Sequence, residues 1–166
     1  MSLSNLTQYL IDKRTSCSNN TYKNRKGLVE KHKHACAIFN GPPSKANILT
    51  IGYNKYDING ITTVHAEINA LDKYYRCKRY SMRNKISILI IRTNGGNSRP
   101  CMHCINTMMT GHMGKIKNVY YTNGDTITKE TFSSLKANSD EHISLCNRAK
   151  MGLLWKYRIL TKIDFY

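Results

Sequence analysis

Two short segments of the sequence, H-A-E at residues 65–67 and P-C-M-H-C at residues 100–104, carry side chains that only a particular fold can bring together. One imidazole and two thiolates are good ligands for Zn²⁺, which is held tetrahedrally and keeps one position open in catalytic sites. The two segments lie far apart in the chain, so the fold must join their starting points. We therefore predict one free carboxylate, Glu67, and three zinc ligands: His65, Cys101 and Cys104.

Each segment is expected at the start of a helix. Apolar residues repeat at helical spacing in the first segment, and two threonines are possible N-caps: Val64, Ile68, Leu71 and Tyr75, with Thr62 and Thr63. Residues i and i+2 of a helix face different ways, so His65 and Glu67 converge only if His65 lies at the helix start. Pro100 is expected to open the second helix, with Cys101 and Cys104 on one face.

The remaining pattern predicts an α/β fold. Leu3, Leu6 and Leu10 indicate a short amphipathic first helix. Strands are expected at residues 35–39, 48–52, 86–91, 116–122 and 126–131. Asn123-Gly124-Asp125 is typical of a tight turn, so the last two strands should form an antiparallel hairpin. Alternation of strands and helices favours a mixed five-stranded sheet with helices packed over it. Ser139 could cap a further helix to Lys150.

Length and composition indicate one domain inside the cell. A chain of 166 residues can bury one proper core but is too short for two ordinary domains, so a single domain over residues 1–166 is predicted. No apolar N-terminal region and no long uncharged apolar run occur, which argues against a secretory or membrane-spanning segment. The six cysteines are then expected to be reduced, in an intracellular, cytoplasmic protein without a membrane partner.

The C-x-x-C pattern alone has two other interpretations. It could be half of a structural zinc ribbon, but the other cysteines stand singly: Cys17, Cys36, Cys77 and Cys146. It could also be a redox motif, which likewise follows a strand at a helix start. That motif normally calls for a later proline beside the site, and the prolines here are Pro42, Pro43 and Pro100. The joint pattern of both segments, in this order, favours a catalytic zinc site.

Together the segments resemble the H-x-E and P-C-x-x-C motifs of zinc-dependent nucleobase deaminases. The chain is similar to the cytidine and deoxycytidylate deaminase superfamily over residues 33–131, which leaves 132–166 as a C-terminal extension. The resemblance implies a cytidine deaminase-like three-layer fold with both zinc-bearing helices on one face of the sheet. It also implies a hydrolase acting on C–N bonds, in which zinc lowers the pKa of a bound water and Glu67 moves protons.

The resemblance also suggests substrate contacts. Asn54 follows the second strand, where superfamily members often place an asparagine that touches the sugar or base; a simple turn residue is the alternative. In the family, backbone at the positions of Ala66 and Pro100 grips the base. Asn69 matches the H-A-E-x-N-A form common among deoxycytidylate deaminases, although a solvated helix residue is an equally simple explanation.

Details of the match point to different subfamilies. A final antiparallel hairpin is typical of free-nucleoside cytidine deaminases, yet these generally have cysteine where this chain has His65. The Trp-bearing loop of APOBEC-type enzymes is missing before Pro100, where the chain has Asn97-Ser98-Arg99. The resemblance implies deamination of a cytosine nucleoside or nucleotide to the uracil product with ammonia release, by a homo-oligomer in nucleotide metabolism. The alternatives are a deaminase acting on bases in RNA or DNA and a catalytically silent, zinc-bound nucleic-acid-binding module.

The formal net charge of +16 keeps nucleic acid open as a partner. Lysines and arginines near phosphates gain affinity by releasing counterions. However, Lys, Asn, Ile and Tyr are all prominent and all have A/T-rich codons, so genome composition is another origin of the charge. A nucleoside monophosphate needs only one or two cations, so a small-molecule substrate fits equally well.

Overall fold

The structure is a computed structural model, and it describes residues 3–16, 22–23, 29–30, 34–56, 63–77, 85–93, 95–112 and 115–138. Its helices are α1 (Leu3–Ser16), the 3₁₀ helix η1 (Lys45–Asn47), α2 (Ala66–Arg76), α3 (Met102–His112) and α4 (Phe132–Ala137). Its strands are β1 (Tyr22–Lys23), β2 (Val29–Glu30), β3 (His34–Asn40), β4 (Ile48–Tyr53), β5 (Lys55–Tyr56), β6 (Thr63–Val64), β7 (Ile86–Arg92), β8 (Ile116–Asn123) and β9 (Thr126–Thr131).

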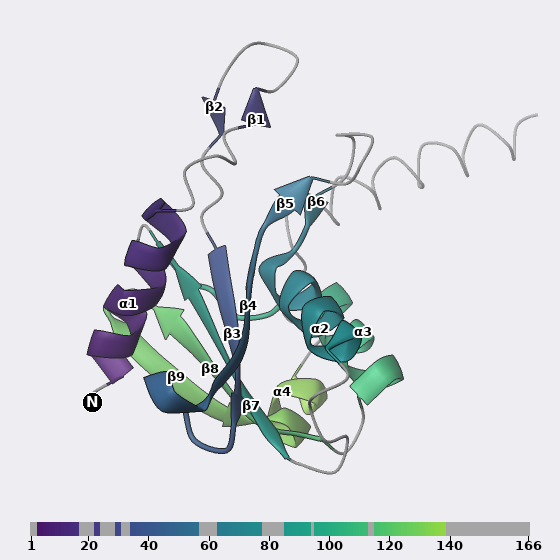
Figure 1. Cartoon of the computed structure of the whole chain (residues 1–166). Coiled ribbons are helices and arrows are strands. Elements are labelled where there is room, and N and C mark those ends of the chain that lie inside the picture. Colours follow the sequence, from purple (N-terminus) through teal and green to yellow (C-terminus); the bar gives the residue numbers. More distant parts are fainter. Residues whose placement is uncertain are drawn as a thin grey trace, which may run out of the picture.

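Five of these strands form the central sheet, in the order β4-β3-β7-β8-β9 (Figure 1). The β7–β8 pair is parallel, and the chain crosses between these strands through α3, as parallel neighbours require. The other pairs are antiparallel, including the final β8–β9 hairpin. The predicted mixed five-stranded sheet and its closing hairpin are therefore confirmed.

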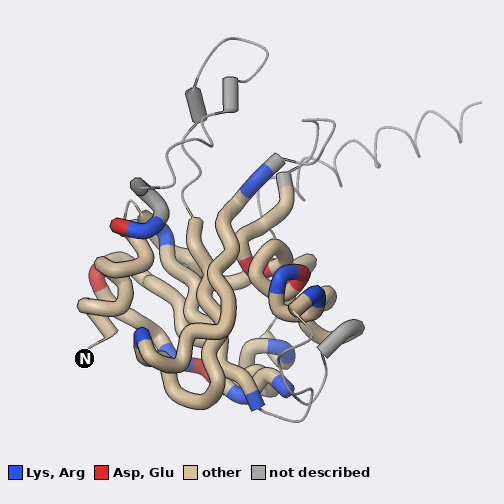
Figure 2. The backbone as a smooth tube through the Cα atoms, viewed as in Figure 1, with Lys and Arg blue, Asp and Glu red and all other residues tan. Residues whose placement is uncertain are grey.

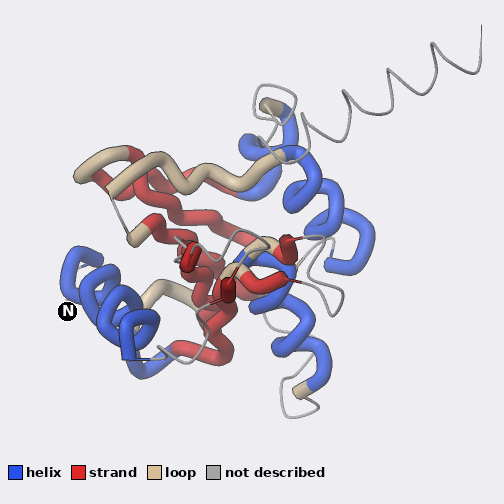
Figure 3. Tube along the Cα trace, turned by 90° about the horizontal axis from the view of Figure 1, so that it is seen from above, coloured by secondary structure: helices blue, strands red, loops and turns tan. Residues whose placement is uncertain are grey.

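The sheet lies between two layers of helices (Figures 1 and 3). Side chains alternate along β3, because successive residues of a strand point to opposite faces. Cys36 and Ile38 join the core shared with α2, α3 and α4, whereas Ala35 and Phe39 join the core beneath α1. The three-layer arrangement with α2 and α3 on one face, as expected, follows from this alternation.

Helix α2 is held unusually close to the edge strand β4. A Cβ atom at Gly52 would collide with backbone atoms of Ala66 and Ala70, so only glycine permits this approach. Thr50 Oγ1 donates a hydrogen bond to the carbonyl oxygen of Ala70 at 3.1 Å. The contact places the first turn of α2 beside the end of β4.

The structure contradicts the expected cap at Thr63, and two other expectations concern residues that it does not describe. The N-cap of α2 is His65 itself, without a side-chain cap bond. Thr63 does not cap the helix, because its segment is drawn into β6, which pairs with β5; Thr62 lies outside the described residues. The expected helix from Ser139 to Lys150 lies outside them too. In the part that is described, no helix is both long and apolar enough to span a membrane.

Candidate metal centre

His65, Cys101 and Cys104 lie together where the starts of α2 and α3 meet. Their ligand atoms all lie within 4.8 Å of one another. The His65 Nδ1 atom is 3.2 Å from Cys104 Sγ and 3.6 Å from Cys101 Sγ. His65 occupies the N-cap position of α2, and Cys101 stands one residue before α3, not inside it as predicted. The structure thus brings together the three residues that the sequence singles out as ligands.

The geometry of this group fits a zinc ion. Around a tetrahedral zinc with Zn–N bonds of about 2.0–2.1 Å and Zn–S bonds of about 2.3 Å, a ligand nitrogen and sulfur lie about 3.6 Å apart. The two observed nitrogen–sulfur distances, 3.2 and 3.6 Å, are close to this value. One imidazole and two cysteine sulfurs are also the donor types that zinc prefers. The group could therefore hold zinc through these three side chains.

The two cysteines differ in their acidity. The pKa of Cys101 is lowered to about 3, first because the Cys104 thiol donates a hydrogen bond to it and also because His65 lies beside it. The pKa of Cys104 is raised, because it holds the proton of that bond and is buried. A coordinating zinc ion deprotonates thiols outright, so it would replace the shared proton.

Glu67 lies in the first turn of α2 with only 5 % of its surface exposed. Burial raises the pKa of its carboxyl group, and the neighbouring His65 opposes this shift. Beneath it, Cys36 of β3 is fully buried, and burial together with the charge of Glu67 raises the pKa of that thiol. Within the described residues, Glu67 is not one of the side chains grouped as possible metal ligands.

The three candidate substrate contacts are Asn54, Ala66 and Pro100. Asn54 follows β4, two residues beyond Gly52, and its backbone N–H donates to the carbonyl oxygen of His34 at 3.4 Å. The Asn54 Oδ1 atom is buried and has no hydrogen-bond partner among the described residues. Ala66 and Pro100 are both buried, next in sequence to His65 and Cys101.

Asn69 is a second buried amide on α2. Asn69 is only 7 % exposed, and its Oδ1 atom likewise has no hydrogen-bond partner in the described part of the chain. The alternative of a solvated helix asparagine is therefore wrong. Because a buried polar atom without a partner is costly, both amide oxygens are suited to accept a hydrogen bond from a ligand.

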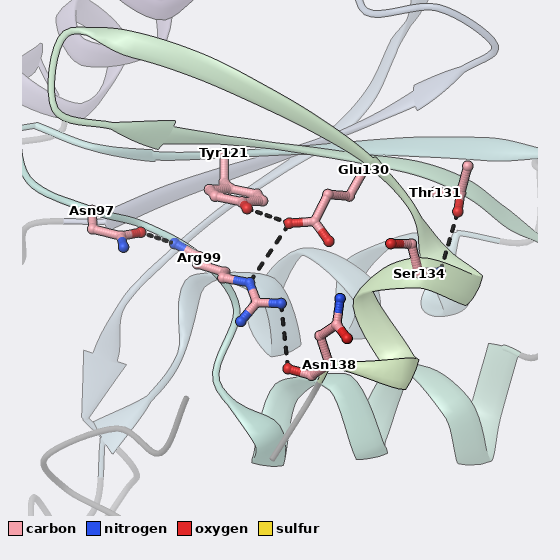
Figure 4. Close-up of polar contacts among 7 residues, drawn as sticks. All are labelled: Asn97, Arg99, Tyr121, Glu130, Thr131, Ser134 and Asn138. Atoms are coloured by element: carbon pink, nitrogen blue, oxygen red, sulfur yellow. Dashed lines mark hydrogen bonds and ion pairs between the residues drawn. The ribbon is translucent and has the colours of Figure 1, made fainter. Parts of the chain in front are cut away.

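Sequence reasoning missed the contacts of the loop that leads into Cys101. Ser98 is buried, and its hydroxyl donates to the carbonyl oxygen of Ile90 at 2.8 Å and contacts the Thr122 hydroxyl at 2.8 Å. Arg99 reaches across to Glu130 of β9 (Figure 4). Their position just before Pro100 could have suggested that both residues support the site. Their partners could not be predicted, because these lie on strands that are distant in the sequence.

Comparison with known proteins agrees with this site. The model of the "Cytidine and deoxycytidylate deaminase zinc-binding region" matches residues 15–122. The solved structure of cytidine deaminase from Burkholderia pseudomallei is similar, with a TM-score of 0.52 and 17 % identity over 77 % of this chain and 94 % of that one. This similarity concerns the fold.

Two further solved structures match less closely. Cytidine deaminase from Mycobacterium leprae has a TM-score of 0.49 and 12 % identity, over 81 % of this chain and 97 % of that one. dCMP deaminase from the cyanophage S-TIM5 has a TM-score of 0.42 and 16 % identity, over 69 % of this chain and 80 % of that one. None of the curated proteins compared with the chain matches it.

Proposed function

Because the chain belongs to the cytidine and deoxycytidylate deaminase family, we propose that it hydrolyses the C4 amine of a cytosine nucleoside or nucleotide. The products are the corresponding uracil compound and ammonia. The observation that carries this proposal is a buried carboxylate, Glu67, beside the joined group of His65, Cys101 and Cys104. A purely structural zinc site needs the ligands but has no use for the carboxylate.

Glu67 is the proton carrier in the proposed reaction. Zinc bound by His65, Cys101 and Cys104 would supply Lewis acidity that lowers the pKa of a coordinated water. The Glu67 carboxylate accepts a proton from the attacking water and delivers it to N3 of the cytosine ring. It then transfers the second water proton to the amine that leaves as ammonia. Burial of Glu67 shields these transfers from bulk solvent.

The substrate is proposed to lie between the end of β4 and the starts of α2 and α3. There Asn54 orients the sugar by accepting a hydrogen bond at its buried Oδ1 atom. The backbone at Ala66 and Pro100 flanks the base, since these residues adjoin the proposed ligands. The antiparallel β8–β9 hairpin supports a free nucleoside within the range of substrates. By the same resemblance we expect a homo-oligomer in the cytoplasm.

A substrate panel tests the proposal. Purified protein loaded with zinc is incubated with cytidine, deoxycytidine, CMP, dCMP, adenosine and a short single-stranded oligonucleotide, and ammonia release is measured. We expect release from at least one of the four cytosine compounds and none from adenosine. Release from the oligonucleotide alone would favour the base-editing alternative, for which the charge of +16 is the supporting observation. Zinc binding without any release would favour the silent module.

A further inference from the structure

The two cysteines of the metal centre are held in different ways. Cys104 lies inside α3, so the helix fixes its backbone. Cys101 precedes the helix, and its carbonyl oxygen accepts the first-turn hydrogen bond from Ile105 N–H at 3.0 Å. On its N-terminal side, Cys101 is preceded by the loop that ends at Pro100. The position of the Cys101 sulfur therefore depends on what holds that loop.

The side chain of Arg99 ties this loop to two other elements (Figure 4). Its Nε atom lies 3.6 Å from Oε1 of Glu130 in β9. Its Nη2 atom donates a hydrogen bond to the carbonyl oxygen of Asn138, the C-cap of α4, at 3.3 Å. The Arg99 backbone N–H donates to Oδ1 of Asn97 at 2.8 Å, which tightens the loop itself.

Glu130 is in turn held by Tyr121. The Tyr121 hydroxyl donates a hydrogen bond to the same Oε1 atom that faces Arg99. Burial raises the pKa of Tyr121, and so does the bond to Glu130, so this hydroxyl keeps its proton and stays a donor. The carboxylate that receives Arg99 therefore cannot swing freely away from it.

Burial makes this ion pair more consequential than an ordinary surface pair. The side chains of Arg99 and Glu130 are only 14 % and 18 % exposed. Exposed pairs contribute little because water and salt screen them, whereas removing one member of a shielded pair leaves the other charge poorly compensated. A lysine could not replace the contact fully, because its single ammonium lacks the planar fork that reaches two acceptors.

We propose that Arg99 is a positioning residue for the zinc centre. By tying the loop before Cys101 to β9 and to the end of α4, it holds the Cys101 thiolate opposite His65 and Cys104. The inference rests on the ligand set of the proposed function. In this role Arg99 acts through Cys101.

Zinc affinity, measured by competition with a chromophoric chelator, tests this role directly. Arg99→Met keeps the aliphatic stem but removes the guanidinium, and we expect it to bind zinc at least roughly tenfold more weakly, as for other residues that support a ligand. Arg99→Lys should recover part of the loss. Glu130→Gln keeps an acceptor for Tyr121 without the charge, and it should weaken zinc binding less than Arg99→Met. It also reports on the contact if Arg99→Met fails to fold.

Thr131→Ala is the matched control for general destabilisation. Thr131 caps α4 in the same region, where its hydroxyl accepts a hydrogen bond from Ser134 N–H at 3.2 Å. Unlike Arg99, it is not part of the loop before Cys101. We expect Thr131→Ala to lower the melting temperature and leave zinc affinity unchanged. Equal zinc affinity in Thr131→Ala, Arg99→Met and the wild type would overturn the proposal.

The outcome is separable from that of the proposed function. If the wild type deaminates nothing in the panel but Arg99→Met still weakens zinc binding, the deaminase proposal fails and the role of Arg99 stands. If deamination occurs and Arg99→Met binds zinc like the wild type, the reverse holds. A wild type that binds no zinc would contradict both.

Discussion

At the scale of single residues, a substitution of Glu67 distinguishes the proposed enzyme from a catalytically silent, zinc-bound module. Glu67→Gln preserves the size of the side chain but cannot accept the water proton. We expect about one zinc per chain in both the wild type and the variant, because Glu67 lies outside the ligand group. Activity should fall by roughly 10² to 10⁴-fold, the usual effect of losing a general acid/base. Metal analysis and ammonia release measure the two quantities.

Asp72 provides the control for this substitution. It is another acid on α2, but its side chain is 46 % exposed and forms a helical ion pair with Arg76 at 3.0 Å. Such exposed pairs contribute little to stability. Asp72→Asn should keep full zinc and full activity. Loss of zinc in Glu67→Gln, with zinc kept in Asp72→Asn, would instead make Glu67 part of the metal-binding set.

At the scale of elements, the contact of α2 with β4 positions the start of α2, where His65 and Glu67 lie. Gly52→Ala should force the strand and helix apart, because its methyl group would meet the backbone of Ala66 and Ala70. We expect the free energy of unfolding to fall by about 1–3 kcal/mol, as overpacking usually costs. Urea denaturation measures this change. Zinc binding should weaken as well, since His65 directly precedes the displaced turn.

Thr50→Val separates packing from hydrogen bonding at the same contact. It removes the bond from Thr50 Oγ1 to the Ala70 carbonyl oxygen but adds no bulk against the helix backbone. We expect a loss of about 1 kcal/mol, in line with one net hydrogen bond. A Gly52→Ala variant no less stable than Thr50→Val would contradict the close packing described for α2.

At the scale of the whole molecule, the question is whether the net charge of +16 is used to bind a nucleic acid. Figure 2 shows the basic residues of the described part scattered over α1, α2, β5 and the opposite end of the sheet in this view, without one continuous stripe. A protein that tracks a nucleic acid loses affinity steeply as salt rises, because each neutralised phosphate releases counterions. The scattered charges of the described part predict a shallow dependence.

Binding of a labelled single-stranded oligonucleotide at 50 mM and 200 mM salt measures this dependence. We expect affinity to fall by much less than the roughly 10³-fold typical of a protein with many phosphate contacts. Turnover of whichever cytosine compound the substrate panel identifies, over the same salt range, is the control for general effects on the enzyme. A steep fall, together with deamination of the oligonucleotide but of none of the small substrates, would establish the nucleic-acid alternative and leave the zinc chemistry unchanged.

The sequence by itself determined the five strands of the central sheet and the residue types of the candidate metal centre, but it did not predict the short strands β1, β2, β5 and β6. The strands predicted at 35–39, 48–52, 86–91 and 116–122 are each one or two residues longer in the structure. The strand predicted at 126–131 has the same bounds as β9. These features are readable because alternation, turn residues and metal-donor types are local properties of the chain. The likeness of the two motifs to known deaminases supplied the rest of the expected fold.

Tertiary structure alone decided how the centre is supported. Thr63 pairs with Tyr56 of β5 and His65 takes the N-cap position of α2, so the cap expected at Thr63 did not form. The burial of Asn69 could not be predicted from its local sequence. Nor could the contact of Arg99 with Glu130, because the two residues lie far apart in the chain. Long-range contacts of this kind form only when strands and helices pack, since neither propensity nor spacing specifies the partner.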